Sequence, residues 1–157
     1  MAVDIGDEAI NRRSTFASGY TLIPWHTTAS LAGNVTSIDI WAEANITGLK
    51  IGAFYTTNGN TLKCRSATSI AGTITMGSKV NKVISLAVEI GDYLGCYFSG
   101  GTISRTTFGA DGRWALEGDH CVVDDEDTYD SNASRTYSIG GYIEGVAAGR
   151  SFGFIIG

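Results

Sequence analysis

The sequence is poor in the residues that most favour helices. Its 157 residues include no glutamine, four lysines and seven leucines, against sixteen isoleucines and seventeen threonines. β-Branched residues fit a pleated strand, whereas straight-chain residues favour a helix. The composition therefore predicts an all-β protein. The length is typical of a single domain, which we place at residues 1–157.

Long apolar runs and an excess of basic charge are also absent. No stretch approaches the ~20 apolar residues that a membrane-spanning helix needs. Eleven lysines and arginines stand against 16 aspartates and glutamates, giving a net charge of -5. The basic residues are too scattered to form the stripe that neutralises nucleic-acid phosphates. We therefore expect neither a membrane nor a nucleic acid as a partner.

The N-terminus does not resemble a signal peptide. Residues 1–8 include three acidic residues, where a signal peptide has a cationic start and an apolar stretch. We expect synthesis in a cytosol without export. A glycan acceptor matters only in a secretory lumen. The three Asn-x-Ser/Thr sequons are therefore interpreted as strand and turn residues: Asn34, Asn45 and Asn132.

Cysteine is scarce. The three cysteines, Cys64, Cys96 and Cys121, are an odd number without C-x-x-C spacing. This pattern predicts neither a disulfide framework nor a zinc knuckle. Cys64 and Cys96 fall inside expected strands and are interpreted as small buried apolar residues.

What the sequence does contain is a series of short alternating segments separated by turn signals. Such a series is typical of a sandwich or barrel. We expect strands at Asn34–Ala42, Leu49–Thr56, Thr61–Ser66, Ser69–Met76, Val80–Ile90, Tyr93–Ser99, Arg113–Leu116, Arg135–Glu144 and Ser151–Ile156. Residues 1–33 form an N-terminal arm with the first strands, and residues 100–134 are a loop-rich segment. The expected core consists of Ile38, Ile40, Leu49, Ile51, Ile84, Leu86, Val88, Leu94, Tyr97 and Phe154.

One acidic run is a candidate metal loop. Asp124–Asp127 reads Asp-Asp-Glu-Asp, and dense carboxylates can supply the six to eight oxygens that Ca²⁺ takes. The run has neither the D-x-D-x-D-G spacing nor the distal glutamate of a calcium loop. We therefore interpret it as a solvated acidic loop that also discourages pairing between sheet edges, and calcium remains the alternative.

Candidate catalytic residues form no recognisable pattern. His120 stands between Asp119 and Cys121, but neighbours on a strand point to opposite faces, and no G-x-S-x-G elbow is present. His26 follows Trp25, and two histidines alone do not make a catalytic zinc site. Four scattered glutamates are weak candidates for a glycosidase pair: Glu43, Glu89, Glu117 and Glu144. We expect no catalytic, cofactor-binding or metal residues, no cofactor and no enzyme activity.

The three tryptophans have two interpretations. Trp25 and Trp114 lie near expected strand ends, and Trp41 lies on the strand face opposite Ile38 and Ile40. Packing in a core or an interface is the favoured interpretation for each. Stacking on a sugar ring is the alternative.

Two segments resemble known jelly-roll proteins. The stretch from Val35–Trp41 (VTSIDIW) to Gly91–Phe98 (GDYLGCYF) resembles sandwich modules in structural proteins of tailed bacteriophages, where a strand often follows a Gly-Asp-Tyr-x-Gly turn. The closing Phe152–Ile156 is similar to the aromatic last strand of trimeric tumour-necrosis-factor-type jelly rolls. The resemblance implies a virion-associated β-sandwich that decorates or cements a capsid or belongs to a fibre.

We therefore predict a single jelly-roll-like antiparallel β-sandwich that acts as a capsid decoration protein in the virion. Its expected partners are copies of itself, with a trimer favoured, and a major capsid protein lattice. A surplus of apolar residues on strand faces, Trp41 and Phe54 among them, supports self-association. Two alternatives stay open: a carbohydrate- or receptor-binding module of a fibre or enzyme, and an extracellular filament subunit.

Overall fold

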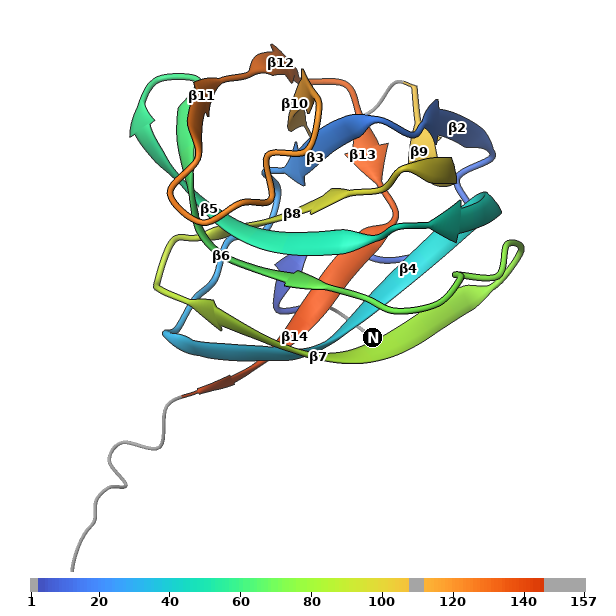
Figure 1. Cartoon of the computed structure of the whole chain (residues 1–157), viewed down its shortest axis with the longest axis horizontal. Helices are drawn as coiled ribbons and strands as arrows, with labels where there is room; N and C mark the ends of the chain where they lie inside the picture. Colours follow the sequence, from blue (N-terminus) through green and yellow to red (C-terminus); the bar gives the residue numbers. More distant parts are fainter. Residues whose placement is uncertain (1–2, 108–111, 146–157) are drawn as a thin grey trace, which may run out of the picture.

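The computed structural model describes residues 3–107 and 112–145, and in these residues it contains strands and no helix (Figure 1). The prediction of an all-β protein is confirmed. The strands are β1 (Ile5–Gly6), β2 (Ser14–Ala17), β3 (Tyr20–Pro24), β4 (Gly33–Thr47), β5 (Lys50–Asn58), β6 (Thr61–Ser69), β7 (Lys79–Val88), β8 (Tyr93–Tyr97), β9 (Gly100–Thr106), β10 (Arg113–Glu117), β11 (Glu126–Thr128), β12 (Asp130–Asn132), β13 (Thr136–Tyr137) and β14 (Ile139–Gly145). The described residues therefore include no candidate for a membrane-spanning helix.

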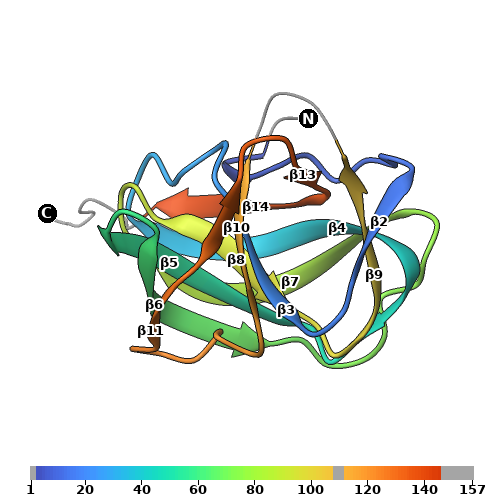
Figure 2. The ribbon, with the colours of Figure 1, turned by 90° about the horizontal axis from the view of Figure 1, so that it is seen from above.

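The strands form two curled antiparallel sheets. The first sheet has the order β1-β14-β4-β9-β13, with β7 beside β4 and β2 beside β9. The second has the order β11-β6-β5-β8-β3-β10-β12. Apart from the β5–β6 hairpin, the chain changes sheet at each step from β3 to β10. Figure 2 shows the two layers from above. The fold is therefore a jelly-roll-like antiparallel β-sandwich, as predicted.

Strand β4 holds the first sheet together. Its first half pairs with β14 on one side and β7 on the other, and its second half pairs with β9. The alternation read from the sequence places Ile38, Ile40 and Ala42 toward the second sheet, and all three are fully buried. Register shifts between Ala42 and Thr47 accompany the change of partner and curl the sheet.

The main core lies between the two sheets and is mostly aliphatic. Most of the predicted core residues are buried in it: Ile38, Ile40, Leu49, Ile51, Leu86, Val88 and Leu94. Ile84 is only partly buried against the same cluster. The prediction for Tyr97 is wrong, because this residue is half-buried on the opposite face of the second sheet. Phe154 lies outside the described residues.

A second cluster covers the outer face of the second sheet. This outer cluster consists of Ile23, Phe54, Leu62, Cys64, Trp114, Cys121 and Tyr129. Residues 118–129 lie over it, held by backbone hydrogen bonds from Asp124 to Cys64, from Cys64 to Asp125 and from Tyr129 to Asn60. The segment is drawn in orange beside β6 in Figure 1. One face of the second sheet thus packs on the first sheet, and the other packs on this segment.

A pair of glycines makes room for the outer cluster. Gly52 and Gly95 face each other across β5 and β8. A Cβ atom at Gly52 would lie 2.8 Å from the Phe54 ring, and one at Gly95 would lie 2.6 Å from it. Phe54 is fully buried in its own chain, so the expectation that it is surplus apolar surface for self-association is wrong.

Several expected boundaries differ from the structure. The expected strand at Ser69–Met76 does not form, since β6 ends at Ser69 and, of residues 70–76, only Ile74 makes a bridge, to Ile46. Gly72, at a φ of 84°, turns the chain there. The segment 100–134 contains β9, which pairs with β2, β4 and β13 and was not anticipated. The expected strand at Ser151–Ile156 lies outside the described residues.

The Gly-Asp-Tyr motif that carries the resemblance is a turn. Gly91 has a φ of 89°, and the Asp92 carboxylate is 1% exposed. That carboxylate accepts hydrogen bonds from Arg65 Nε at 2.7 Å and Nη2 at 3.0 Å, and from the Glu89 backbone N–H at 2.9 Å. The motif thus ties the β7–β8 turn to β6.

Candidate functional site

One histidine faces two carboxylates at the edge of the outer cluster. His120 lies in the loop after β10, Asp125 ends that loop, and Asp127 is in β11. His120 Nδ1 is 3.1 Å from Asp125 Oδ1 and 3.1 Å from Asp127 Oδ2. One ligand atom from each of the three residues lies within 4.8 Å of the others. We call these three residues the His–Asp cluster.

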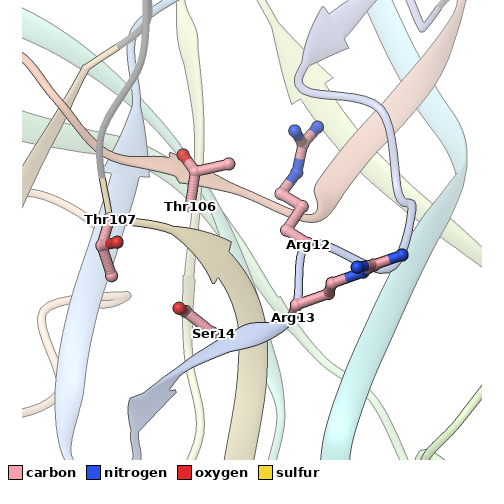
Figure 3. Close-up of a pocket in the computed structure, with 5 residues that line it drawn as sticks. All are labelled: Arg12, Arg13, Ser14, Thr106 and Thr107. Atoms are coloured by element: carbon pink, nitrogen blue, oxygen red, sulfur yellow. The ribbon is translucent and has the colours of Figure 1, made fainter.

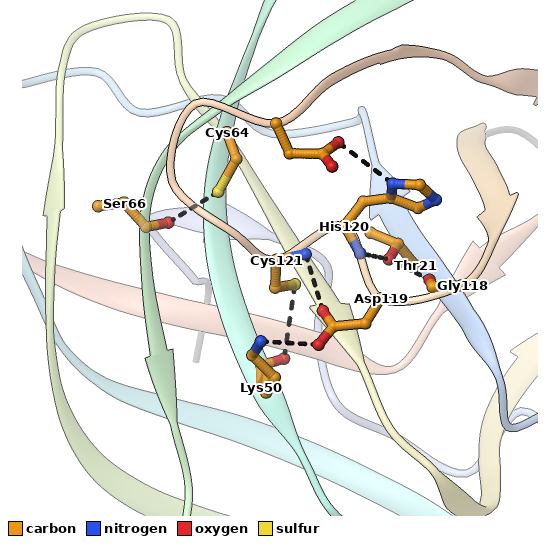
Figure 4. Close-up of polar contacts among 9 residues, drawn as sticks. Thr21, Lys50, Cys64, Ser66, Gly118, Asp119, His120 and Cys121 are labelled. Atoms are coloured by element: carbon orange, nitrogen blue, oxygen red, sulfur yellow. Dashed lines mark hydrogen bonds and ion pairs between the residues drawn. The ribbon is translucent and has the colours of Figure 1, made fainter.

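Backbone contacts position each member of the His–Asp cluster. The His120 backbone N–H donates to Thr21 Oγ1 at 2.9 Å (Figure 4). Asp125 is held by a hydrogen bond from its N–H to Val122 O and by another from Cys64 N–H to its own carbonyl. Asp127 pairs with Leu62 in the β11–β6 ladder. The side chains therefore converge because the loop folds back on the second sheet.

The tautomer of His120 follows from its other contact. His120 Nε2 is 2.9 Å from the carbonyl oxygen of Glu117, and a carbonyl oxygen only accepts hydrogen bonds. Nε2 therefore carries a proton. Nδ1, which faces the carboxylates, is the nitrogen that is left to bind a proton or a metal ion.

Burial and charge disturb the ionisation of the cluster. Partial burial raises the pKa of Asp125, the neighbouring Asp127 raises it further, and the hydrogen bond with His120 lowers it. The side chains of His120, Asp125 and Asp127 are 18%, 27% and 42% exposed. The cluster is thus half shielded but open to solvent on one side.

The acidic run divides into two pairs of side chains. Asp124 and Glu126 are exposed, with Asp124 4.0 Å from Lys63 Nζ, in keeping with a solvated acidic loop. Asp125 and Asp127 turn toward His120 instead. Sequence reasoning weighed the run and the histidine separately and so missed the cluster. The available signal was local, because His120 and Asp127 are only seven positions apart.

The residues of the possible Cys/His pair point apart. Cys121 Sγ contacts Lys50 O at 4.0 Å (Figure 4), whereas the His120 ring faces Asp125. Asp119 accepts hydrogen bonds from Lys50 Nζ at 2.7 Å and from the Cys121 backbone N–H. Burial raises the pKa of the Cys121 thiol well above its ordinary value. A buried thiol of this kind is a poor nucleophile.

The remaining candidates are dispersed. Glu43 lies in β4, Glu89 in the β7–β8 turn, Glu117 at the end of β10 and Glu144 in β14. His26 is exposed, and its Nδ1 is 3.3 Å from the buried Asp7 carboxylate. These positions do not gather the candidates at one place.

Two tryptophans build an aromatic group on the outer face of the second sheet. The rings of Trp25 and Tyr93 each meet the Trp114 ring edge to face at 4.9 Å. Trp114 is buried, and its Nε1–H donates to Asn60 Oδ1 at 2.9 Å. Trp25 is half-buried and lies over Gly112. Of these two indoles, Trp25 is the more accessible.

Trp41 belongs to a different surface, on the outer face of the first sheet. Val83 in β7 and Tyr142 in β14 both stand opposite Ser37 of β4, and Trp41 shares this face. Val83 is 86% exposed, and Trp41 and Tyr142 are half-buried. We call these three residues the β7 face. Strand β7 forms the lower rim of the first sheet in Figure 1.

A polar network supports the β7 face. The Asp39 carboxylate accepts hydrogen bonds from Tyr142 Oη at 2.6 Å and Asn81 Nδ2 at 2.9 Å. The hydrogen bond to Asp39 is the main cause that raises the pKa of Tyr142 to about 12. These hydrogen bonds therefore brace the face from β14 to β7.

A pocket of about 270 Å³ lies between β2 and β9, lined by Arg12, Arg13, Ser14, Thr106 and Thr107. Arg12 donates to Ser138 Oγ and to Glu8 O. In Figure 3 the two guanidinium groups point away from the three hydroxyl groups. The pocket therefore does not aim its charged and hydroxyl groups at one point.

No protein-family model matches this sequence, and no curated protein matches it.

Proposed function

We propose that the protein is a non-catalytic structural β-sandwich that works by association, as a capsid decoration protein in the virion of a tailed bacteriophage. The observation that supports this role is the β7 face. A side chain as exposed as Val83 (86%), on the same braced sheet face as Trp41 and Tyr142, suits burial against a partner surface. The proposed partners are further copies of this chain, in a trimer, and a capsid lattice.

Contact through the face fits the chemistry of β7 better than contact through its edge. Lys79 and Lys82 lie along β7, and edge lysines oppose pairing with another strand. Apolar burial contributes about 25 cal/mol per Å², so a face of this kind gives a modest single contact. Many copies on one lattice then reach firm attachment through avidity.

The proposal is tested by Val83→Asp, with Val123→Asp as the matched control. Val123 is also an exposed valine, 54% accessible, but it lies in the loop after β10. Light scattering after size exclusion should show an oligomer for the wild-type protein and for Val123→Asp, and a single chain for Val83→Asp. Unchanged circular dichroism shows that each variant folds. Equal masses for all three proteins would contradict association through the β7 face.

A sugar-binding module is the second candidate, and the accessible Trp25 favours it. A half-buried indole beside Trp114 and Tyr93 is a surface on which a pyranose ring stacks. On a glycan array, this function requires the wild-type protein to bind one sugar class and Trp25→Ala to lose that binding while staying folded. Under the decoration role, the array shows no binding.

A further inference from the structure

We propose that the His–Asp cluster is a binding site for a divalent transition-metal ion of the zinc class. The site would hold the ion through His120 Nδ1, Asp125 Oδ1 and Asp127 Oδ2. It is independent of the β7 face, which lies on the other sheet. The sequence alone did not predict it.

The first support is the convergence of three electron-rich atoms. Because His120 donates from Nε2 to Glu117 O, its Nδ1 faces two carboxylate oxygens, each 3.1 Å away, with room between them for a proton or for a cation that displaces it. Three such atoms repel one another unless a positive charge lies between them. A metal ion placed there satisfies all three at once.

The contact to Glu117 also matches the usual surroundings of a metal-bound histidine. Such a histidine donates its other ring N–H to a carbonyl or carboxylate, which fixes the tautomer and orients the ring. Ligand atoms about 2.0–2.2 Å from a tetrahedral zinc ion lie about 3.3–3.6 Å from one another. The 3.1 Å separations of Nδ1 from the two carboxylate oxygens are slightly shorter, so a small outward movement of the side chains would admit the ion.

The second, independent observation is the hydroxyl group of Tyr129. Tyr129 is only 3% exposed, and its hydroxyl oxygen has no hydrogen-bond partner among the described residues. Its ring meets the His120 ring edge to face at 5.9 Å. Burial raises the pKa of the Tyr129 hydroxyl, and the negative charges of Asp125 and Asp127 raise it further. A buried hydroxyl without a partner often marks a missing water or ion. A metal-bound water molecule within reach of the Tyr129 hydroxyl would supply that partner.

The donor set selects the kind of metal. Ca²⁺ takes six to eight oxygen ligands and rarely an imidazole, whereas Zn²⁺ and its neighbours accept nitrogen and oxygen together. One imidazole and two carboxylates therefore favour Zn²⁺ over Ca²⁺. The proposed site would use only two of the four acidic residues in the run.

Metal binding would fasten the cover of the outer cluster. His120 lies in the loop before β11, and Asp127 lies in β11 itself. One ion bound to both residues would therefore link the loop to the strand. Tyr129 and Cys121, which this segment carries, are buried in the outer cluster. A ligand that binds only the folded state raises its stability, so Zn²⁺ should raise the melting temperature.

The test is calorimetric titration of ZnCl₂ into the chelator-treated full chain. We expect one Zn²⁺ per chain, and His120→Gln and Asp127→Asn should each weaken binding at least ~tenfold. His26→Gln and Asp124→Asn are the matched controls and should bind as the wild type does. CaCl₂ should give no saturable binding. Asp127 is half-exposed, so Asp127→Asn is the variant expected to fold if His120→Gln does not.

Nitrogen NMR of the His120 ring gives a second readout. Zn²⁺ should shift Nδ1 while Nε2 keeps its proton. Either of two results would overturn the proposal. One is a doubly protonated His120 ring that Zn²⁺ leaves unchanged at neutral pH. The other is equal Zn²⁺ affinity in the wild type, His120→Gln and Asp127→Asn, which would indicate only diffuse attraction to the acidic run.

Discussion

The two hydrophobic clusters of this protein are built in different ways. The main core joins two sheets and contains mostly isoleucine, leucine, valine and alanine. The outer cluster joins one sheet to an irregular segment, and five of its seven buried residues are aromatic or cysteine. The larger main core buries only two aromatic rings, Phe98 and Tyr137, and one cysteine, Cys96. Regular strands pack with alternating aliphatic side chains, whereas a loop needs large rings and specific polar contacts to cover a sheet.

The difference indicates that the inner side of the second sheet contributes mainly to stability, whereas the outer side carries the candidate binding groups. The inner side supplies stability through close aliphatic packing. The outer side holds the His–Asp cluster and Trp25, which both remain partly open to solvent. Candidate binding groups thus gather where the cover is a loop, as is common for loops on a rigid scaffold.

A matched pair of leucines tests this comparison with the largest expected effect. Leu86 is buried in the main core and Leu62 in the outer cluster. Leu86→Ala should lower the free energy of unfolding by ~2–5 kcal/mol. Leu62→Ala should cost less, because the covering segment can relax into the space. Urea unfolding measures both, and a larger loss at Leu62 would contradict the ranking.

The reactivity of the three cysteine thiols tests whether the outer cluster opens more easily than the main core. Burial raises the pKa of Cys64 to about 11 and that of Cys96 to about 12. An aromatic disulfide reagent should therefore leave all three thiols unlabelled at mildly alkaline pH until the protein unfolds. If the outer cluster opens locally, Cys64 and Cys121 will react before Cys96.

The same shifts predict an alkaline loss of stability. Because folding raises these thiol pKa values above the ordinary value of 9.0, their contribution is fully present below pH 9. It is lost as the pH rises toward about 11 to 12, since the unfolded thiols ionise first. Melting temperatures measured from neutral pH upward should fall in this window, and a flat profile would contradict the shifts.

The glycine pair sharpens the comparison with a smaller effect. Gly95→Ala should place a methyl group against the Phe54 ring and cost ~1–3 kcal/mol through overpacking. Phe54→Leu in the Gly95→Ala background should cost less than the sum of the two single changes, because the ring is what the methyl group meets. If the losses in unfolding free energy of the two single variants simply add, the methyl group at position 95 does not clash with the Phe54 ring.

The smallest expected effect concerns the polar contact of the aromatic group. Asn60→Ala removes the acceptor of the Trp114 indole N–H and should cost ~0.5–1.5 kcal/mol. Tryptophan fluorescence should shift as the indole loses its partner. An unchanged spectrum and unchanged stability would mean that water replaces the amide fully.

The main core was predicted well because apolar and polar residues alternate along the strands that form it. Ile38 and Ile40 on β4, and Leu86 and Val88 on β7, follow the two-residue period of a half-buried strand. Each of these side chains faces the other sheet, so burial and period agree. The all-β fold class follows from the same residues.

The outer cluster was not predictable in this way. Phe54 and Tyr97 lie on the strand face opposite the main core, and only a distant segment buries them. Nothing in the local period shows that residues 118–129 fold over the sheet. The His–Asp cluster depends on that fold, although the close spacing of His120, Asp125 and Asp127 was visible in the sequence.

Association is tested most directly by sedimentation velocity of the wild-type full chain over a range of micromolar concentrations. The decoration role predicts a species of three times the 16.5 kDa chain mass, which Val83→Asp converts to single chains. A 16.5 kDa species at every concentration, for the wild type as for the variant, would contradict it.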